Sequence, residues 1–331
     1  MTNWSRFSRR KFVFGMASGI FVFPVREGGA RPMEWNEIKQ ANHAFPASNS
    51  SVYSDYLSYY QIHLPTDCEH QAGFIDTPSY RIFTQCFTPN NANGTILLLH
   101  GYLDHTGLWG DWIVELIAAG WKVCTIDLPG HGLSTGRRGH ISDFSHYQTI
   151  LDCVLSLICK KEHLTAALGH STGAAIIADA LIRGVSIKKS IFVAPLLKIR
   201  LGDWIGFGTA FLPSSFSISP GVQKRTSNPD YFAMRKADPL RSNKISIGWL
   251  KAAKKWKNHI EQSPSSAASA LLVQGENDSV VDFKYNLIGY QRLFPKVIIK
   301  SIPNGRHHLL NEAGEIRRRV RDTILHFVQN P

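Results

Sequence analysis

Short apolar runs that alternate with helix-like segments place the strongest constraint on how this chain folds. The apolar runs cover residues 95–99, 122–126, 164–168, 190–194 and 270–274. Nearly continuous apolar runs of this length are typical of strands that are buried on both faces of a sheet. The segments between them, 112–119, 145–159 and 174–183, have helical spacing. The alternation predicts an α/β fold, with a mostly parallel central sheet and helices on both of its faces.

The alternation is interrupted once, by residues 197–269. A connection between parallel strands needs about 10–12 residues or somewhat more, so most of these 73 residues form an insertion. We therefore expect an α/β core made of residues 76–196 and 270–331. Residues 31–75 are polar and rich in tyrosine in their second half. We expect them to form an N-terminal extension that packs on the core without carrying chemistry.

The first thirty residues have the character of an export signal. Ser8 to Val13 reads Ser-Arg-Arg-Lys-Phe-Val and resembles a twin-arginine motif, and a moderately apolar run to Val25 follows. About 14 apolar residues are too few to span a bilayer, which takes about 20, and small residues at 28–30 suit a cleavage site. We expect residues 1–30 to be a signal peptide and the protein to be periplasmic or otherwise exported in a bacterium. A frayed basic tail and an uncleaved membrane anchor are the alternatives.

The net charge of +12 is concentrated in two segments. Residues 1–30 carry +4, the insertion carries +8, and the remainder is neutral. A basic chain suggests nucleic-acid binding, but no recognisable nucleic-acid module accompanies the charge. We therefore expect no nucleic-acid partner, and the sequence leaves the oligomeric state open.

Five cysteines occur, and none forms a Cys-x-x-Cys pair. Cys124 lies in an apolar run, and Cys153 and Cys159 lie on a helix-like segment, so we interpret these three as buried small hydrophobes. Cys68 and Cys86 either pair in an oxidising compartment or stay reduced.

A Gly-x-Ser-x-Gly turn joins the apolar run that starts at Leu164 to the helix-like segment that follows. The turn spans Gly169, His170, Ser171, Thr172 and Gly173. Small residues at such a corner allow a strained backbone that exposes the serine hydroxyl. The pattern predicts that Ser171 is a nucleophile.

Other reactive side chains also follow apolar runs. His100-Gly101-Tyr102 follows residues 95–99, Asp278 follows 270–274, and His307 follows 297–299. Because the carboxyl ends of parallel strands meet at one edge of a sheet, we expect these residues to lie near Ser171. Serine, aspartate and histidine occur in that order, which is the chain order of α/β-hydrolases.

Further motifs strengthen this likeness. They are Leu99–His105, Asp127–Gly136, Gly169–Gly173, Asn228–Asp230 with Ala237–Leu240, and Arg306–Glu312. With them the chain resembles the α/β-hydrolase family, in particular its monoacylglycerol lipase and lysophospholipase (serine aminopeptidase S33-type) branch. The resemblance spans roughly residues 78 to 325. It is highly specific for the fold and less specific for the substrate, and it leaves residues 31–70 uncovered.

The resemblance and the chemistry together imply a role for each residue. Ser171 attacks an ester carbonyl, His307 is the base that removes the serine proton, and Asp278 orients the imidazole. The backbone N–H groups of Tyr102 and Thr172 form the oxyanion hole. The remaining predicted site residues are His100 and Gly101 in the oxyanion loop and Gly169, His170 and Gly173 in the nucleophile elbow.

Several neighbours compete for these roles. His308 competes with His307, and alignment on the following Leu-Leu-Asn-Glu favours His307. Asp282 and Glu276 compete with Asp278, which stands three residues after the glycine that ends the strand.

We assign His131 and His140 to loop structure. No histidine and acid cluster has metal spacing, so we expect neither a metal nor another cofactor.

The insertion falls where this family carries its cap. Residues 204–212 are apolar and rich in glycine, which suits an acyl-chain channel, a membrane-facing lip or simple packing on the core. From Trp249 onward, apolar residues share one helical face and lysines share the other. The lysines form either a solvated face or a contact with phosphate headgroups and an anionic membrane surface.

These observations predict a serine hydrolase that cleaves the carboxylic ester of a singly acylated lipid. A lysophospholipid or a monoacylglycerol is the expected substrate. An esterase for small non-lipid esters and a catalytically inactive binding protein on the same scaffold are the alternatives. An aminopeptidase is disfavoured because a cationic amino terminus needs acids near the site, whereas the insertion is strongly basic.

Overall fold

A nine-stranded sheet forms the centre of the computed structural model, which describes residues 44–48, 51–159, 164–200, 211–219 and 225–330. The strand order is β1-β2-β3-β5-β4-β6-β7-β10-β11. The strands are β1 (Ala47–Ser48), β2 (Cys68–Asp76), β3 (Arg81–Pro89), β4 (Thr95–Leu99), β5 (Lys122–Ile126), β6 (Leu164–His170), β7 (Ile187–Val193), β10 (Ala270–Gly275) and β11 (Ile298–Ile302). From β5 to β11 neighbouring strands are parallel, and β1, β2 and β3 pair in the antiparallel sense. The predicted mostly parallel sheet is confirmed.

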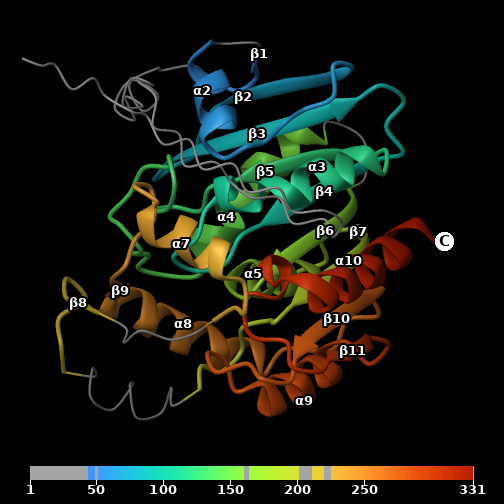
Figure 1. The fold of residues 1–331 in the computed structure, drawn as a ribbon. Coiled ribbons are helices and arrows are strands. Elements are labelled where there is room, and N and C mark those ends of the chain that lie inside the picture. The colour runs from blue at the N-terminus through green and yellow to red at the C-terminus, as the bar shows by residue number, and fades with distance from the viewer. Residues whose placement is uncertain (1–43, 49–50, 160–163, 201–210, 220–224, 331) are drawn as a thin grey trace, which may run out of the picture. The chain divides into compact units, whose positions relative to one another are not determined.

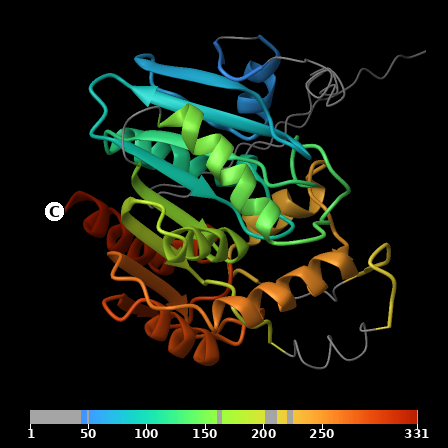
Figure 2. The same ribbon diagram turned by 180° about the vertical axis from the view of Figure 1, so that it is seen from behind.

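Helices cover both faces of this sheet (Figures 1 and 2). They are α2 (Ser51–Tyr59), α3 (Gly110–Ala118), α4 (Ser145–Ile158), α5 (Thr172–Ile182), α9 (Phe283–Leu293) and α10 (Gly314–Gln329), with short 3-10 turns at Thr106–Trp109 and Leu309–Asn311. Helices α3 and α10 share one face, where Arg317 and Glu115 form an ion pair at 2.9 Å. Helices α4 and α5 cover the opposite face (Figure 2). The apolar runs of the sequence therefore lie between two helical layers, which explains why they lack polar alternation.

The sheet extends further toward the N-terminus than the sequence indicated. Strand β2 lies within the expected extension of residues 31–75, yet it pairs with β3 over nine residues. Its aromatic and small residues alternate too weakly to reveal a strand. Helix α2 buries Tyr53 and Tyr56 against the same end of the sheet. The expected boundary at residue 75 therefore falls inside a sheet strand.

The insertion contributes its own elements over the carboxyl edge of the sheet. They are β8 (Ser217–Ile218), α7 (Pro229–Ala237), β9 (Ile245–Ser246) and α8 (Ile247–Ile260), with β8 and β9 paired as a separate two-stranded sheet. Asn228 caps α7 by accepting the N–H groups of Asp230 and Tyr231, and proline follows it at the first helical position. We call these elements the cap. Residues 204–212, for which the sequence leaves a channel, a membrane-facing lip and simple packing open, fall largely outside the described residues, and the expected signal peptide of residues 1–30 lies wholly outside them.

Helix α8 has the two faces that the sequence predicts. Ala252, Ala253, Trp256 and Ile260 are buried, whereas the lysines lie outside the core. Two of the lysines have acidic partners. Nζ of Lys255 lies 2.6 Å from Oδ2 of Asp143, and Nζ of Lys257 lies 2.7 Å from Oε2 of Glu261. In the described part of the chain, no helix combines the length and the apolar character that crossing a membrane requires.

The structure corrects the expectation for the cysteines. Cys86 forms a disulfide with Cys124, not with Cys68. The two bonded residues are directly opposed on the antiparallel strands β3 and β5, with Cα atoms 4.2 Å apart. Cys68 lies at the far end of β2, opposite Pro89. Cys86 and Cys124 meet because β3 and β5 are neighbours in the sheet. The sequence does not reveal this pairing.

Candidate active site

The predicted site residues meet at the carboxyl ends of parallel strands. His100 follows β4, Ser171 follows β6, Asp278 follows β10, and His307 follows β11. All four are buried, with at most 7% of their surface exposed. Ser171 and His307 line one cavity of about 90 Å³, together with Tyr102 and His170.

Ser171 occupies a strained corner between β6 and α5. Its backbone has φ 51° and ψ −107°, a conformation that residues other than glycine rarely adopt. Its N–H donates to the carbonyl of Val193 at 2.9 Å, which holds the corner against β7. A Cβ atom at Gly173 would overlap the carbonyl oxygen of Leu99. Glycine is therefore required there because α5 starts directly against the end of β4.

His307 and Asp278 form a buried hydrogen-bonded pair. Nδ1 of His307 lies 2.8 Å from Oδ2 of Asp278. Oδ1 of Asp278 accepts the N–H groups of Val280 at 2.8 Å and Val281 at 3.1 Å. Burial alone raises the pKa of Asp278, but the His307 ring and these N–H groups outweigh it and hold the pKa below its usual value. The ionised carboxylate fixes the proton of His307 on Nδ1 and leaves Nε2 as a proton acceptor.

His100 connects the oxyanion loop to the turn after β5. Its Nδ1–H donates to the carbonyl of Gly101, and its Nε2 accepts the N–H of Leu128, both at 2.8 Å. These two bonds require the neutral ring. Burial lowers the pKa of His100 to about 4, so the ring stays neutral at neutral pH.

Tyr102 joins the same loop to the cap. Its hydroxyl donates to the carbonyl of Gly139 at 2.6 Å and accepts the N–H of Ser246 at 2.9 Å. Its ring stacks on Trp249 of α8, with centroids 3.8 Å apart. Thr172 is the first residue of α5, where backbone N–H groups have no partner within the helix. That the N–H groups of Tyr102 and Thr172 form the oxyanion hole stays a prediction.

His170 has a contact beyond its place in the elbow. Its Nε2–H donates to the backbone carbonyl of His307 at 2.9 Å. Burial lowers the pKa of His170 to about 4, with a further contribution from the nearby His307 ring. The neutral ring therefore connects the elbow directly to the loop that carries the predicted base.

The competing residues lie elsewhere in the structure. His308 points toward Asp104, with Nδ1 3.5 Å from Oδ2, and burial lowers its pKa well below the usual value. Asp282 caps α9 by accepting the N–H of Tyr285, and Glu276 is exposed. The structure therefore pairs His307 with Asp278. Asp282, Glu276 and His308 take no part in this pair.

Buried ion pairs between the core and the cap were missed by the sequence analysis. Asp104 accepts a hydrogen bond from Nε of Arg235 in α7 at 2.9 Å, and His105 lies 2.8 Å from Asp238 at the end of that helix. Tyr60 also donates to Asp238, at 3.2 Å. The partners are 131 and 133 residues apart, so no local pattern could show them. Asp104, His105 and Asp238 belong to the quoted motifs, whereas Arg235 lies between two of them.

Spatial proximity also creates a set of possible metal ligands that sequence spacing does not reveal. Ligand atoms of Asp104, His170 and His308 lie within 4.8 Å of one another. The guanidinium of Arg235 already occupies Oδ1 of Asp104. This positive charge opposes a cation at the same carboxylate, so the set does not fit a metal.

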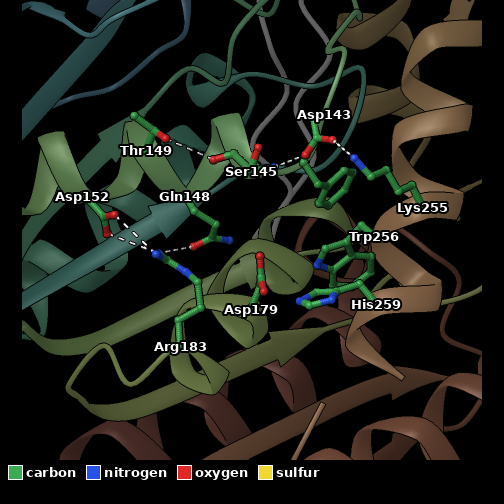
Figure 3. Close-up of a pocket in the computed structure, with 11 residues that line it drawn as sticks. Asp143, Ser145, Gln148, Thr149, Asp152, Asp179, Arg183, Lys255, Trp256 and His259 are labelled. Carbon is green, nitrogen blue, oxygen red and sulfur yellow. Dashed lines mark hydrogen bonds and ion pairs between the residues drawn. The ribbon is translucent and has the colours of Figure 1, made fainter. Parts of the chain in front are cut away.

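A larger cavity of about 300 Å³ lies away from Ser171, among α4, α5 and α8 (Figure 3). Four of its charged groups form two ion pairs: Asp143 contacts Lys255, and Asp152 contacts Arg183. The hydroxyl of Thr149 donates to the carbonyl of Ser145 within α4. Among the described residues that line this cavity, no histidine has a hydrogen bond to a carboxylate, whereas His307 at the smaller cavity has one. The smaller cavity at Ser171 is therefore the candidate active site.

Known proteins resemble the chain over most of its length. Residues 90–314 match the family described as serine aminopeptidase, S33. The monoacylglycerol lipase of Mycolicibacterium smegmatis is 25% identical over 268 residues, which cover 76% of this chain and 93% of that protein. The probable lysophospholipase L2 of Haemophilus influenzae is 23% identical over 282 residues, covering 70% of this chain and 83% of that protein.

Solved structures show the same fold. The crystal structure of the Paleococcus ferrophilus monoacylglycerol lipase superimposes with a TM-score of 0.64 at 22% identity, and covers 75% of this chain and 98% of that one. The chain belongs to the serine aminopeptidase S33 family, and the predicted α/β-hydrolase fold is confirmed.

The buried neutral histidines predict that acid destabilises the fold. His100 and His170 have folded-state pKa values of about 4, whereas an unfolded histidine titrates near 6.5. Below pH 6.5 the unfolded chain binds protons that the folded chain does not, so the free energy of unfolding falls as the pH drops toward 4. Each such residue lowers the free energy of unfolding by about 1.4 kcal/mol for every pH unit that the pH falls within this window.

Urea denaturation at pH 7, 5.5 and 4.5 measures the effect. His100→Gln keeps a donor and an acceptor but does not titrate, so its stability should depend less steeply on pH. A free energy of unfolding that stays constant between pH 7 and 4.5 contradicts the prediction.

Proposed function

We propose that this chain is a carboxylic ester hydrolase that cleaves singly acylated lipids through an acyl-enzyme intermediate on Ser171. The observation that carries the proposal is the hydrogen-bonded His307–Asp278 pair, whose histidine lines the same cavity as a serine held in a strained elbow. A serine hydroxyl needs a neighbouring base to become nucleophilic, and the second nitrogen of an imidazole that a carboxylate orients is such a base.

The reaction proceeds in two steps. Oγ of Ser171 attacks the ester carbonyl while Nε2 of His307 accepts the serine proton, and the N–H groups of Tyr102 and Thr172 stabilise the resulting oxyanion. Collapse of this intermediate breaks the bond to the alcohol, which leaves with the proton from His307. A water molecule then attacks the acyl-serine ester by the same route. It releases the fatty acid and restores Ser171.

The cavity walls favour a lipid over a small polar ester. Its described lining is mostly apolar and includes side chains from both the core and the cap: Leu196, Ile199, Ile218, Ile245, Trp249, Leu250, Val280 and Val281. An acyl chain gains free energy by leaving water for such walls, about 0.8 kcal/mol for each buried methylene group. The names of the two relatives, a monoacylglycerol lipase and a probable lysophospholipase, support the same substrate class.

An aminopeptidase reaction fits this cavity less well. A peptide substrate would bring a cationic amino terminus, which needs a nearby carboxylate. Among the described residues that line the cavity there is no aspartate or glutamate, and the one charged side chain is Arg225. The name of the family therefore does not carry over as an activity.

Two further proposals concern where the enzyme acts. The twin-arginine-like leader supports export, and the Cys86–Cys124 disulfide supports an oxidising compartment outside the bacterial cytoplasm. The exposed lysines of α8 support contact with an anionic membrane surface, although Lys255 and Lys257 are partly neutralised by their acidic partners. Lys254 is exposed and remains available for such a contact.

The nucleophile assignment predicts selective labelling by a fluorophosphonate. Wild-type protein should react at Ser171, and Ser171→Ala should abolish both labelling and hydrolysis. Asp278→Asn should keep the fold but lower kcat by about 10³- to 10⁴-fold, because the imidazole loses its fixed tautomer.

Hydrolysis should increase with acyl length on monoacylated lipids. Unlabelled wild-type protein contradicts the mechanism, and activity confined to short-chain esters contradicts the lipid substrate.

The export proposal predicts the redox state of two cysteines. In a bacterial host, Cys86 and Cys124 of the exported protein should resist alkylation after denaturation until they are reduced, because both are buried in the folded protein. Replacing Arg9 and Arg10 by lysine should retain the protein inside the cell, and both thiols should then react with the alkylating reagent after denaturation without prior reduction. Retention of the disulfide and of export in this variant contradicts the proposal.

The membrane proposal predicts a charge-dependent affinity for lipid vesicles. Lys254→Glu should weaken sedimentation with anionic vesicles at low salt and leave the affinity for neutral vesicles unchanged. Lys188→Glu, which changes an exposed lysine of the core, is the matched control. Equal binding of wild type and Lys254→Glu to anionic vesicles contradicts the proposal.

A further inference from the structure

Three arginines of the insertion lie near one another, and one of them, Arg225, lines the active-site cavity. Arg225, Arg235 and Arg241 influence one another electrostatically, and Asp104 is the carboxylate that acts on all three. We call these three residues the arginine cluster. Asp238, the other nearby acid, is already paired with His105. The cluster therefore carries more positive than negative charge close to Ser171.

The guanidinium of Arg235 is only partly satisfied by Asp104. Arg235 is 9% exposed, and its Nε donates to Oδ1 of Asp104 at 2.9 Å. Its Nη2 is buried without a hydrogen-bond partner in the described structure, and the same holds for Nε of Arg241. Buried guanidinium nitrogens without acceptors are costly. The Tyr231 hydroxyl is the other polar group that acts on Arg235, and an anion bound beside the cluster would supply further acceptors.

Arg225 is the member of the cluster that faces the cavity. It lines the same space as Ser171 and His307. Within the described residues, its side chain has neither an ion pair nor a hydrogen bond with another group. Burial, together with repulsion from Arg235 and Arg241, lowers its pKa to about 10. The side chain is therefore still charged at neutral pH.

The backbone of Arg225 is held firmly against the loop that carries the base. Its carbonyl accepts the N–H of His308 at 2.9 Å. The next two residues, Thr226 and Ser227, hydrogen-bond the buried carboxylate of Glu312, which also accepts the N–H of Arg306. This arrangement fixes the backbone of Arg225 relative to the loop that carries His307.

We propose that Arg225 binds a phosphate group on the alcohol part of the substrate, and that the enzyme prefers phosphate-bearing monoacyl lipids to neutral monoacylglycerols. This inference rests on the proposed function. The other described cavity walls are apolar or carry neutral imidazoles, so they suit the acyl chain and place the anion on the leaving alcohol. A guanidinium matches the geometry of phosphate oxygens, and the net positive charge that the arginine cluster keeps after the pairing of Arg235 with Asp104 favours a phosphate that carries more than one negative charge.

The test compares two soluble substrates that differ only in the phosphate. Hexanoyl glycerol and hexanoyl glycerol 3-phosphate, both below their aggregation limits, remove any effect of a lipid surface. Wild-type kcat/KM should be at least about 10-fold higher for the phosphate ester. Arg225→Met should lower that value about 10- to 100-fold and change the value for the neutral ester less than about 3-fold. For the phosphate ester, kcat/KM of Arg225→Lys should lie between the values of the wild type and of Arg225→Met. Lys254→Met removes an equal charge from the exposed face of α8 and should leave the ratio unchanged.

Protection against labelling supplies a readout that does not require turnover. Glycerol 3-phosphate should slow the reaction of wild-type Ser171 with a fluorophosphonate, whereas glycerol should not, and Arg225→Met should lose this protection. Equal losses on both substrates, or protection that persists in Arg225→Met, overturn the inference. Wild-type preference for the neutral ester overturns it and leaves the proposed lipase function intact. Hydrolysis of neither ester by a labelled enzyme counts against the proposed function, and the protection assay then decides on Arg225 alone.

Discussion

The buried polar side chains of the loop after β4 constrain the rest of this structure. Asp104 is fully desolvated, and a buried carboxylate is stable only if an opposite charge or hydrogen bonds compensate it. The compensation comes from Arg235 in the cap, and the adjacent His105 pairs with Asp238 at the end of the same helix. Removing one partner would leave an uncompensated charge in the core. The cap is therefore an integral part of the fold, although it is inserted into the chain as a separate segment.

The parts of the fold that the sequence predicts are those that depend on local pattern. Apolar runs identify buried strands, and the small residues around Ser171 identify the elbow, because both signals lie within a few consecutive residues. Placement after strand ends was enough to bring Asp278 and His307 together, since parallel strands end at one edge.

What the sequence does not show depends on which distant segments meet. The Cys86–Cys124 bond requires knowing that β3 pairs with β5, and the Asp104–Arg235 pair requires knowing how α7 sits on the core. The charge of the cap was visible, but its distribution was not. Some lysines of α8 are paired with acids at the surface, whereas Arg235 and Arg241 each keep a buried guanidinium nitrogen without a hydrogen-bond partner among the described residues. The net charge suggested a membrane contact, and only the contacts distinguish the surface lysines from the buried arginines that the proposed phosphate site uses.

Tyr102 links the oxyanion loop to helix α8 of the cap. Its backbone belongs to the oxyanion loop, while its side chain is attached to the first turn of α8 through Ser246 and Trp249. Any displacement of α8 would therefore also displace the loop that carries the backbone N–H predicted to line the oxyanion hole. The position of this helix and the geometry of the predicted oxyanion hole are linked through a single side chain.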